Sequence, residues 1–315
     1  MRIVIALAEH ALHKRGERGG SQADGCCVRS AAQRLARIVD GNDVVLVYES
    51  GHRNGVATSA QEGGDRLHDG AMPPPAHAAP DAIIDGGFEQ ELRHCLTAAR
   101  LCTTLQAMIE VDIADPAFDH PDKPIGGVLL DRRAVAEAQA KHWTMASDGI
   151  GYRRVVPNPK PVRLAQSQAL RRLIEQRTVV MCDGGIPVVA GNDGLLHRVE
   201  AIIDPYAGAA VIAEAIDADL FVIATEMAGV FLDWGTANSK LLRHGHPNVV
   251  EEFVCAAGAM GPKLQAASRF AQRTGRRAAI GALADVERLI EGTAGTTISC
   301  EWVDPSRFSG GAVAR

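Results

Sequence analysis

Apolar residues in this chain form short unbroken runs, separated by stretches with helical spacing. The clearest runs span residues 3–7, 43–48, 178–180 and 219–225. Unbroken apolar runs of this length are typical of strands that are buried on both faces of a parallel sheet. The run at 178–180 is followed by Gly184 and Gly185, and we take it to be the central strand.

Amphipathic stretches between these runs predict helices. Residues 30–39 place Leu35 and Ile38 on one face, with Ser30 as the expected N-cap. Further helices are expected at residues 88–99, 134–141, 207–216, 247–257, 262–274 and 285–291, and further strands at 101–111, 278–280 and 296–299. Strands that alternate with helices predict a three-layer α/β/α sandwich with an open, mainly parallel sheet.

Two regions interrupt the alternation. Residues 49–87 are rich in Gly, Ala, His and Pro, which predicts loop with at most one short helix. Residues 115–161 carry many prolines and cations, a composition that does not suit a core layer. We interpret this second region as an excursion that leaves the sheet and returns to it, and such an insertion is able to form a lid.

Composition narrows the class of protein. The chain has 315 residues, 46% apolar content and a net charge of −5 without a basic stretch, so nucleic acid is not an expected partner. It has no apolar run of the ~18 residues that a membrane span needs. Seven cysteines without zinc spacing predict no metal site and suit a reducing cytoplasm.

Common catalytic motifs are absent. The sequence contains no G-x-x-x-x-G-K-[ST], no G-x-G-x-x-G after the first strand and no G-x-S-x-G, so P-loop, dinucleotide-binding and simple hydrolase functions lack support. Cys182 beside Asp183 is a candidate nucleophile for a hydrolase. The alternative is a buried structural thiol, because no histidine is near it in the sequence.

Glycines and lysines at expected strand-to-helix turns point to phosphate chemistry. Gly184 and Gly185 would let backbone N–H groups approach a phosphate, although a tight turn alone also explains them. Lys123 and Lys263 precede or begin expected elements, and Lys263 lies in the first turn of a helix. A lysine beside a helix N-terminus suits a transferring phosphoryl group, and a solvated surface role is the alternative for each lysine.

The chain resembles the carbamate kinases of the amino-acid kinase superfamily through ten motifs in order. These are residues 1–7, 14–17, 88–92, 115–118, 123–126, 151–157, 159–162, 184–188, 199–204 and 260–263. The resemblance implies an amino-terminal lobe, residues 1–200, for the acceptor and for dimer contact, with residues 115–161 as the protruding lid. It implies that residues 201–315 form the nucleotide-binding lobe.

The resemblance also implies a reaction: reversible phosphoryl transfer between ATP and carbamate, giving ADP and carbamoyl phosphate, with Mg²⁺. It implies a cytoplasmic homodimer that acts on small molecules in arginine metabolism. The implied catalytic residues are Lys123, Asp204 and Lys263. The implied nucleotide-binding residues are Thr225, Glu226, Gly229, Val230, Phe231, Met260, Gly261 and Lys263. The implied acceptor and phosphate loops contain Ala8, Glu9, His10, Gly51, His52, Arg153, Asp183, Gly184 and Gly185.

Several of these positions depart from the family pattern. Ala8-Glu9-His10 stands where the family has Gly-Gly-Asn, Cys182-Asp183-Gly184-Gly185 stands where the family has four glycines, and Pro205 replaces a lysine. Losing one positioned charge in phosphoryl transfer costs on the order of 10² to 10³ in rate. The sequence therefore leaves two functions open: a carbamate kinase-like enzyme with weak activity or a changed acceptor, and an inactive homologue that acts as a binding or regulatory subunit.

Overall fold

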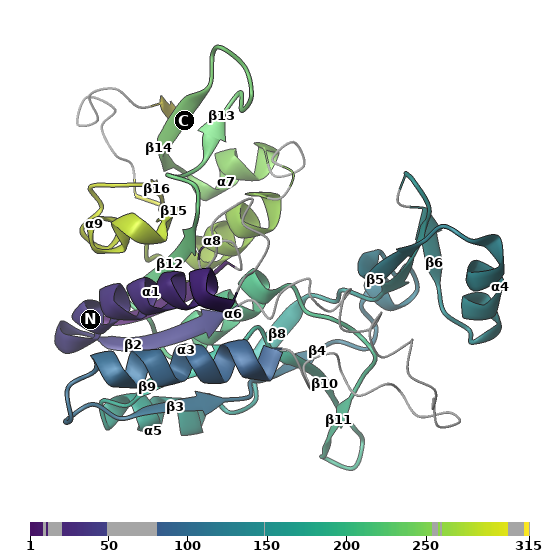
Figure 1. The fold of residues 1–315 in the computed structure, drawn as a ribbon, viewed down its shortest axis with the longest axis horizontal. Coiled ribbons are helices and arrows are strands. Elements are labelled where there is room, and N and C mark those ends of the chain that lie inside the picture. Colours follow the sequence, from purple (N-terminus) through teal and green to yellow (C-terminus); the bar gives the residue numbers. More distant parts are fainter. Residues whose placement is uncertain are drawn as a thin grey trace.

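The computed structural model describes residues 1–8, 11, 21–48, 81–147, 149–253, 258, 260–301 and 312–314. The largest sheet within these ranges has ten strands in the order β13-β14-β16-β15-β12-β1-β2-β9-β3, with β17 beside β14 (Figure 1). Its strands are β1 (Arg2–Leu7), β2 (Asp43–Tyr48), β3 (Cys102–Leu105), β9 (Val179–Asp183), β12 (Leu220–Thr225), β13 (Phe231–Leu232), β14 (Lys240–Gly245), β15 (Ala278–Ala282), β16 (Thr296–Ile298) and β17 (Ala312–Ala314). The six strands from β15 to β3 all run parallel.

Helices cover both faces of this sheet, and the alternation of β1 shows why. Ile3, Ile5 and Leu7 belong to one buried cluster, and Val4 and Ala6 belong to another, because successive side chains of a strand point to opposite faces. The first cluster includes residues of α1 (Ser21–Gly41), α3 (Asp81–Cys95) and α9 (Val286–Glu291). The second includes residues of α5 (Ser167–Glu175), α6 (Pro205–Ala215) and α8 (Gly261–Thr274). The predicted α/β/α sandwich is confirmed.

Three sequence predictions about individual elements are wrong. Ser30 lies inside α1, which begins at Ser21, so Ser30 is not an N-cap. The single strand expected at 101–111 is two strands in different sheets, β3 and β4 (Met108–Val111). The strand at 178–180 is β9, which lies between β2 and the edge strand β3, so it is not central. An apolar run shows that both faces of a strand are covered. It does not show whether the strand lies at the centre of the sheet or near its edge.

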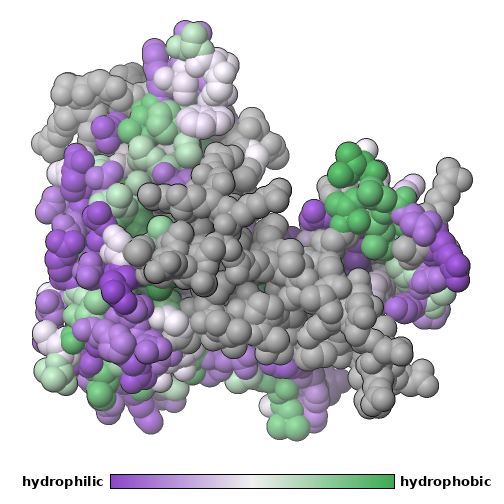
Figure 2. Space-filling view, in the orientation of Figure 1, coloured by the Kyte–Doolittle hydropathy of each residue, from purple (hydrophilic) through white to green (hydrophobic). Residues whose placement is uncertain are grey.

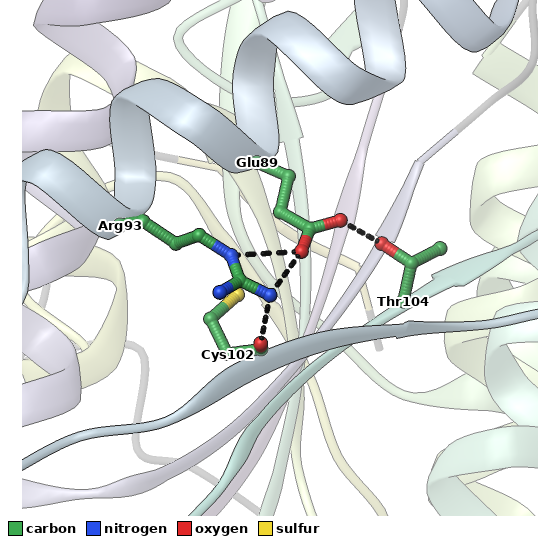
Figure 3. A network of polar contacts seen from close by, with 4 residues as sticks. All are labelled: Glu89, Arg93, Cys102 and Thr104. Carbon is green, nitrogen blue, oxygen red and sulfur yellow. Dashed lines mark hydrogen bonds and ion pairs between the residues drawn. The ribbon is translucent and has the colours of Figure 1, made fainter.

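A polar network attaches α3 to the edge strand β3 (Figure 3). Arg93 donates from Nε to Glu89 Oε1 at 2.9 Å and from Nη2 to the carbonyl of Cys102 at 2.6 Å. The hydroxyl of Thr104 donates to the other oxygen of Glu89 at 2.5 Å. These contacts lower the pKa of Glu89 against the effect of its partial burial, which is the largest single influence. Charged side chains of α3 therefore bind one backbone carbonyl and one side chain of the edge strand β3.

A smaller sheet extends from the carboxyl side of the main one. It has the order β11-β10-β4-β8 and adds β8 (Pro161–Leu164), β10 (Ile186–Ala190) and β11 (Leu196–Arg198). The antiparallel pair β10–β11 forms a hairpin. Two short elements complete the second half, α7 (Pro247–Val250) and a 3-10 turn at Glu251–Phe253. The prediction of one continuous helix over 247–257 is therefore wrong, because the α-helix ends at Val250. Residues 254–257 lie outside the described residues.

The excursion between residues 115 and 161 has a sheet of its own and stands away from the rest of the molecule (Figure 1). This protruding subdomain contains β5 (Lys123–Leu129), α4 (Arg132–Ala140), β6 (Met145–Ser147) and β7 (Tyr152–Val156). Its exposed large hydrophobic side chains are Leu130, Ile150 and Tyr152. Figure 2 shows a hydrophobic area on the surface of this subdomain.

Candidate active site

Four neighbouring parallel strands end on one line. Leu7 of β1 pairs with Ala224 of β12 on one side and with Tyr48 of β2 on the other. Tyr48 in turn pairs with Asp183 of β9. From β1 the chain proceeds to β2 on one side and later returns to β12 on the other, so the direction of winding changes between β1 and β12. Open α/β sheets bind ligands at the carboxyl ends of their strands at such a point.

Most of the predicted acceptor loop follows directly from these strand ends. Ala8 is buried, and its N–H donates to the carbonyl of Ala224 at 2.9 Å, which extends the ladder by one residue. Glu9, His10, Gly51 and His52 lie outside the described residues.

The turn after β9 is in backbone contact with α6. A Cβ added to Gly184 would lie 2.7 Å from Cβ of Pro205, and one added to Gly208 would lie 1.9 Å from the carbonyl oxygen of Gly184. Gly185 has φ of +109°, in the region that favours glycine. Close packing against α6 therefore accounts for Gly184, and the positive φ accounts for Gly185. The contact of Gly184 with α6 fixes the start of the helix at the line of strand ends.

Asp183 is directed toward the connection between β3 and β4. Its side chain is buried, and Oδ1 accepts the N–H of Ala107 at 2.9 Å. This carboxylate therefore joins the main sheet to the smaller one.

Cys182 lies in the core under the same turn. It is fully buried, and burial raises the pKa of its thiol far above the ordinary value. A thiol needs access and a lowered pKa to act as a nucleophile, so the hydrolase hypothesis for Cys182 is wrong.

We expect Cys182→Ala to leave turnover within about twofold of the parent and to cost about 1 kcal/mol of stability, as a small core truncation does. Steady-state rates and thermal melts of the two proteins would check this. Loss of turnover in a variant that is still folded would restore a chemical role for Cys182.

Asp204 occupies the N-cap of α6 and divides its two oxygens. Oδ1 accepts the N–H groups of Tyr206 at 3.0 Å and Ala207 at 3.2 Å, and Oδ2 pairs with Nζ of Lys123 at 3.5 Å. The amide of Asn158 orients the cap by accepting the N–H of Asp204 at 3.1 Å. Lys123 is the first residue of β5, so this ion pair joins the protruding subdomain to α6.

Pro205 is the first residue of α6, where a missing N–H costs nothing and the ring favours the helical φ. The substitution that removes a lysine from the family pattern therefore also stabilises the turn that carries Asp204.

Lys263 approaches the same turn from α8. Its Nζ lies 4.3 Å from the ring centroid of Tyr206, within the range of a cation–π contact. Lys263 is in the first turn of α8, with Met260 at the N-cap, and no side chain of the described residues caps this helix. Gly261 is buried at its start. The start of α6 thus contacts two lysines, Lys123 at Asp204 and Lys263 at Tyr206.

The other predicted nucleotide residues follow β12. Thr225 is buried, and its hydroxyl accepts the N–H of Met227 at 2.8 Å, whereas Glu226 is exposed. The N–H of Val230 donates to the hydroxyl of Thr296 at 2.9 Å, after the buried Gly229. The ring of Phe231 lies 5.2 Å from that of Trp234, which is largely exposed.

Arg153, another predicted site residue, belongs to the protruding subdomain. It lies on β7 and pairs with Ala146, within the protruding subdomain. Its link to the site is through its strand, since Val156 of β7 pairs with Lys123.

Sequence reasoning missed Tyr206, Asn158 and Trp234. Asn158 lies between the family motifs at 151–157 and 159–162, and this location was a signal in the sequence that it belongs to the site. Tyr206 contacts a lysine 57 residues away in the sequence (263 minus 206), and no local pattern reports such a contact.

Known proteins are similar to this chain along nearly its whole length. The sequence model of the amino acid kinase family matches residues 1–282. The carbamate kinase of Haemophilus influenzae is 39% identical over 302 residues, covering 95% of this chain and 97% of the relative. The carbamate kinase of Pyrococcus horikoshii is 33% identical, covering 95% and 99%.

The chain belongs to the carbamate kinase family. Solved structures agree with this assignment. A structure from Aeropyrum pernix K1 has a TM-score of 0.84 at 28% identity and covers 96% of this chain and all of its own. The Giardia lamblia carbamate kinase bound to AMP-PNP has a TM-score of 0.79 at 25% identity, with coverage of 95% and 98%.

Membership in the carbamate kinase family confirms the predicted fold and the predicted class of enzyme. The chain is a carbamate kinase-like, ATP-dependent phosphotransferase with small-molecule substrates. Among the helices of the described ranges, none is both long and apolar enough to cross a membrane. The described part of the chain also holds no group of three or more His, Cys, Asp or Glu residues arranged for a metal ion.

Proposed function

We propose that this protein transfers a phosphoryl group between ATP and carbamate, and that the transfer occurs at the first turn of α6. The observation that carries the proposal is the pair of lysines beside this turn. Lys123 reaches it through Asp204, and Lys263 reaches it through the ring of Tyr206. Two ammonium groups from separate parts of the fold therefore contact residues at the start of one helix.

This arrangement suits phosphoryl transfer on electrostatic grounds. The transferring group spreads negative charge over its oxygens, and catalysis depends on cations and N–H dipoles that are already in position. Lys123 and Lys263 supply the cations. The positive end of α8, which no described side chain caps, supplies backbone donors and a favourable dipole. In this proposal Asp204 does not contact the phosphate but holds Lys123 and the start of α6.

Two of the departures from the family pattern, Asp183 and Pro205, are less damaging than the sequence suggests. The carboxylate of Asp183 accepts a backbone N–H of Ala107, so hydrogen bonding directs it toward the sheet connection. Pro205 removes a cation but fixes the helix start. These two observations favour an active enzyme over an inactive homologue.

The remaining assignments belong to the same proposal. Residues 201–315 would bind the nucleotide through the segment after β12 and through Met260 and Gly261, and residues 1–200 would bind the acceptor. Mg²⁺ would arrive on the nucleotide phosphates and neutralise part of their charge, since it is usually held through phosphates and its own waters. The protruding subdomain would close over the site and cover part of its exposed hydrophobic surface. The homodimer, the cytoplasmic location and the role in arginine metabolism remain predictions.

The direct test is ATP formation from ADP and carbamoyl phosphate with Mg²⁺, run beside calorimetric titration with ADP. We expect Mg²⁺-dependent turnover. ADP binding without turnover would contradict carbamate as the acceptor and support the regulatory alternative. If the protein neither binds ADP nor forms ATP, the proposed reaction is wrong.

A further inference from the structure

We propose that Tyr206 is the positioning residue for Lys263, and that its aromatic face sets where the ammonium group meets the transferring phosphoryl group. This inference rests on the proposed function and adds to it a residue whose role the family motifs do not indicate. It starts from the contact of Lys263 Nζ with the ring of Tyr206, 4.3 Å from the centroid.

The Tyr206 ring is held firmly. Only 3% of the residue is exposed, and it belongs to the core cluster that also contains Leu264 of α8. Its N–H donates to Asp204, and Pro205 before it fixes the backbone at the helix start. A ring that is confined in this way presents one face at a fixed place, which a flexible partner would not do.

Lys263, in contrast, needs a partner at its position. A lysine has a long flexible side chain, and an ammonium group in the first turn of a helix meets the positive end of the helix dipole. The negative face of an aromatic ring attracts a cation without neutralising its charge or occupying its N–H donors with an anion. The ring therefore helps to hold the ammonium group in place without itself neutralising its charge.

The same turn then organises both lysines. The carboxylate of Asp204 holds Lys123, and Tyr206, two residues later in the chain, holds Lys263. With Pro205 in place of a lysine, the rate depends on the exact placement of the two cations that remain, and displacement by about 1 Å is enough to cost on the order of 10²-fold.

The experiment compares Tyr206→Phe, Tyr206→Leu and a series in which residue 206 is phenylalanine with increasing fluorination. Leucine removes the aromatic face, and fluorination weakens its negative potential with little change in volume. We expect Tyr206→Leu to lower kcat by about 10- to 100-fold. We expect phenylalanine to retain most of the turnover and kcat to fall steadily with each added fluorine. Equal kcat for the phenylalanine and leucine variants, or no trend with fluorination, would overturn the proposal.

A second readout does not depend on turnover. Competitive labelling with acetic anhydride, followed by mass spectrometry, compares the reactivity of Lys263 with that of the exposed Lys240 in the same molecule. We expect Lys263 to react several-fold faster in Tyr206→Leu and at the parent rate in Tyr206→Phe. Unchanged reactivity in Tyr206→Leu would overturn the positioning role. Altered reactivity in a protein without turnover would uphold it while the proposed reaction fails.

Discussion

Lys263→Ala is expected to lower kcat for ATP formation by about 10² to 10³-fold, the typical cost of losing one positioned charge from an anionic transition state. The side chain lies in the first turn of α8 and contacts Tyr206 in the first turn of α6, whose N-cap Asp204 pairs with Lys123. Since a positioned cation stabilises charge that develops in the transition state, kcat should fall more than the affinity for ADP.

The substitution should leave the fold intact. Removing Lys263 loses the contact with Tyr206, worth about 0.5 to 2 kcal/mol, and relieves an unfavourable helix-dipole interaction of about 0.3 to 1 kcal/mol. These effects oppose each other, so the melting temperature should change little. Lys141→Ala is the matched control, because Lys141 is exposed on the protruding subdomain. A Lys263→Ala enzyme with more than a tenth of parental kcat would contradict the role assigned to this lysine.

Gly208→Ala is expected to destabilise the protein by about 3 kcal/mol and to reduce turnover with it. The added Cβ would lie 1.9 Å from the carbonyl oxygen of Gly184. The backbone fixes the positions of both atoms, so no side-chain rotation relieves the contact. Overpacking of a tight interior contact costs about 1 to 3 kcal/mol and sometimes more. The start of α6 would have to move from the strand ends, and Asp204 and Tyr206 would move with it.

Helix propensity alone predicts the opposite sign, because alanine is favoured over glycine by about 1 kcal/mol inside a helix. Gly87→Ala in α3 is the matched control, since a Cβ there meets nothing within 4 Å. We expect Gly87→Ala to raise the denaturation midpoint and Gly208→Ala to lower it. A stabilised Gly208→Ala protein would show that the turn after β9 does not hold α6 by this contact.

Local patterns determined most of the fold. The runs at 3–7, 43–48 and 219–225 became β1, β2 and β12, because strands covered on both faces tolerate apolar residues at every position. Helix stops were also local: Gly275 and Gly292 follow α8 and α9 with φ of +69° and +78°. Strand order was not local, and this is why the sequence misplaced β9 as central and joined β3 to β4.

The sequence by itself determined the family and predicted three charged site residues, Lys123, Asp204 and Lys263, through motifs that lie far apart along the chain. Only the tertiary structure decided what those residues do for one another. Asp204 joins Lys123 because β5 returns to the start of α6, and Tyr206 meets Lys263 because α6 packs against α8. Asp183 and Pro205, which read as lost function in the sequence, serve a sheet connection and a helix start. A side chain's role depends on its partners, and partners distant in sequence are brought together only by packing.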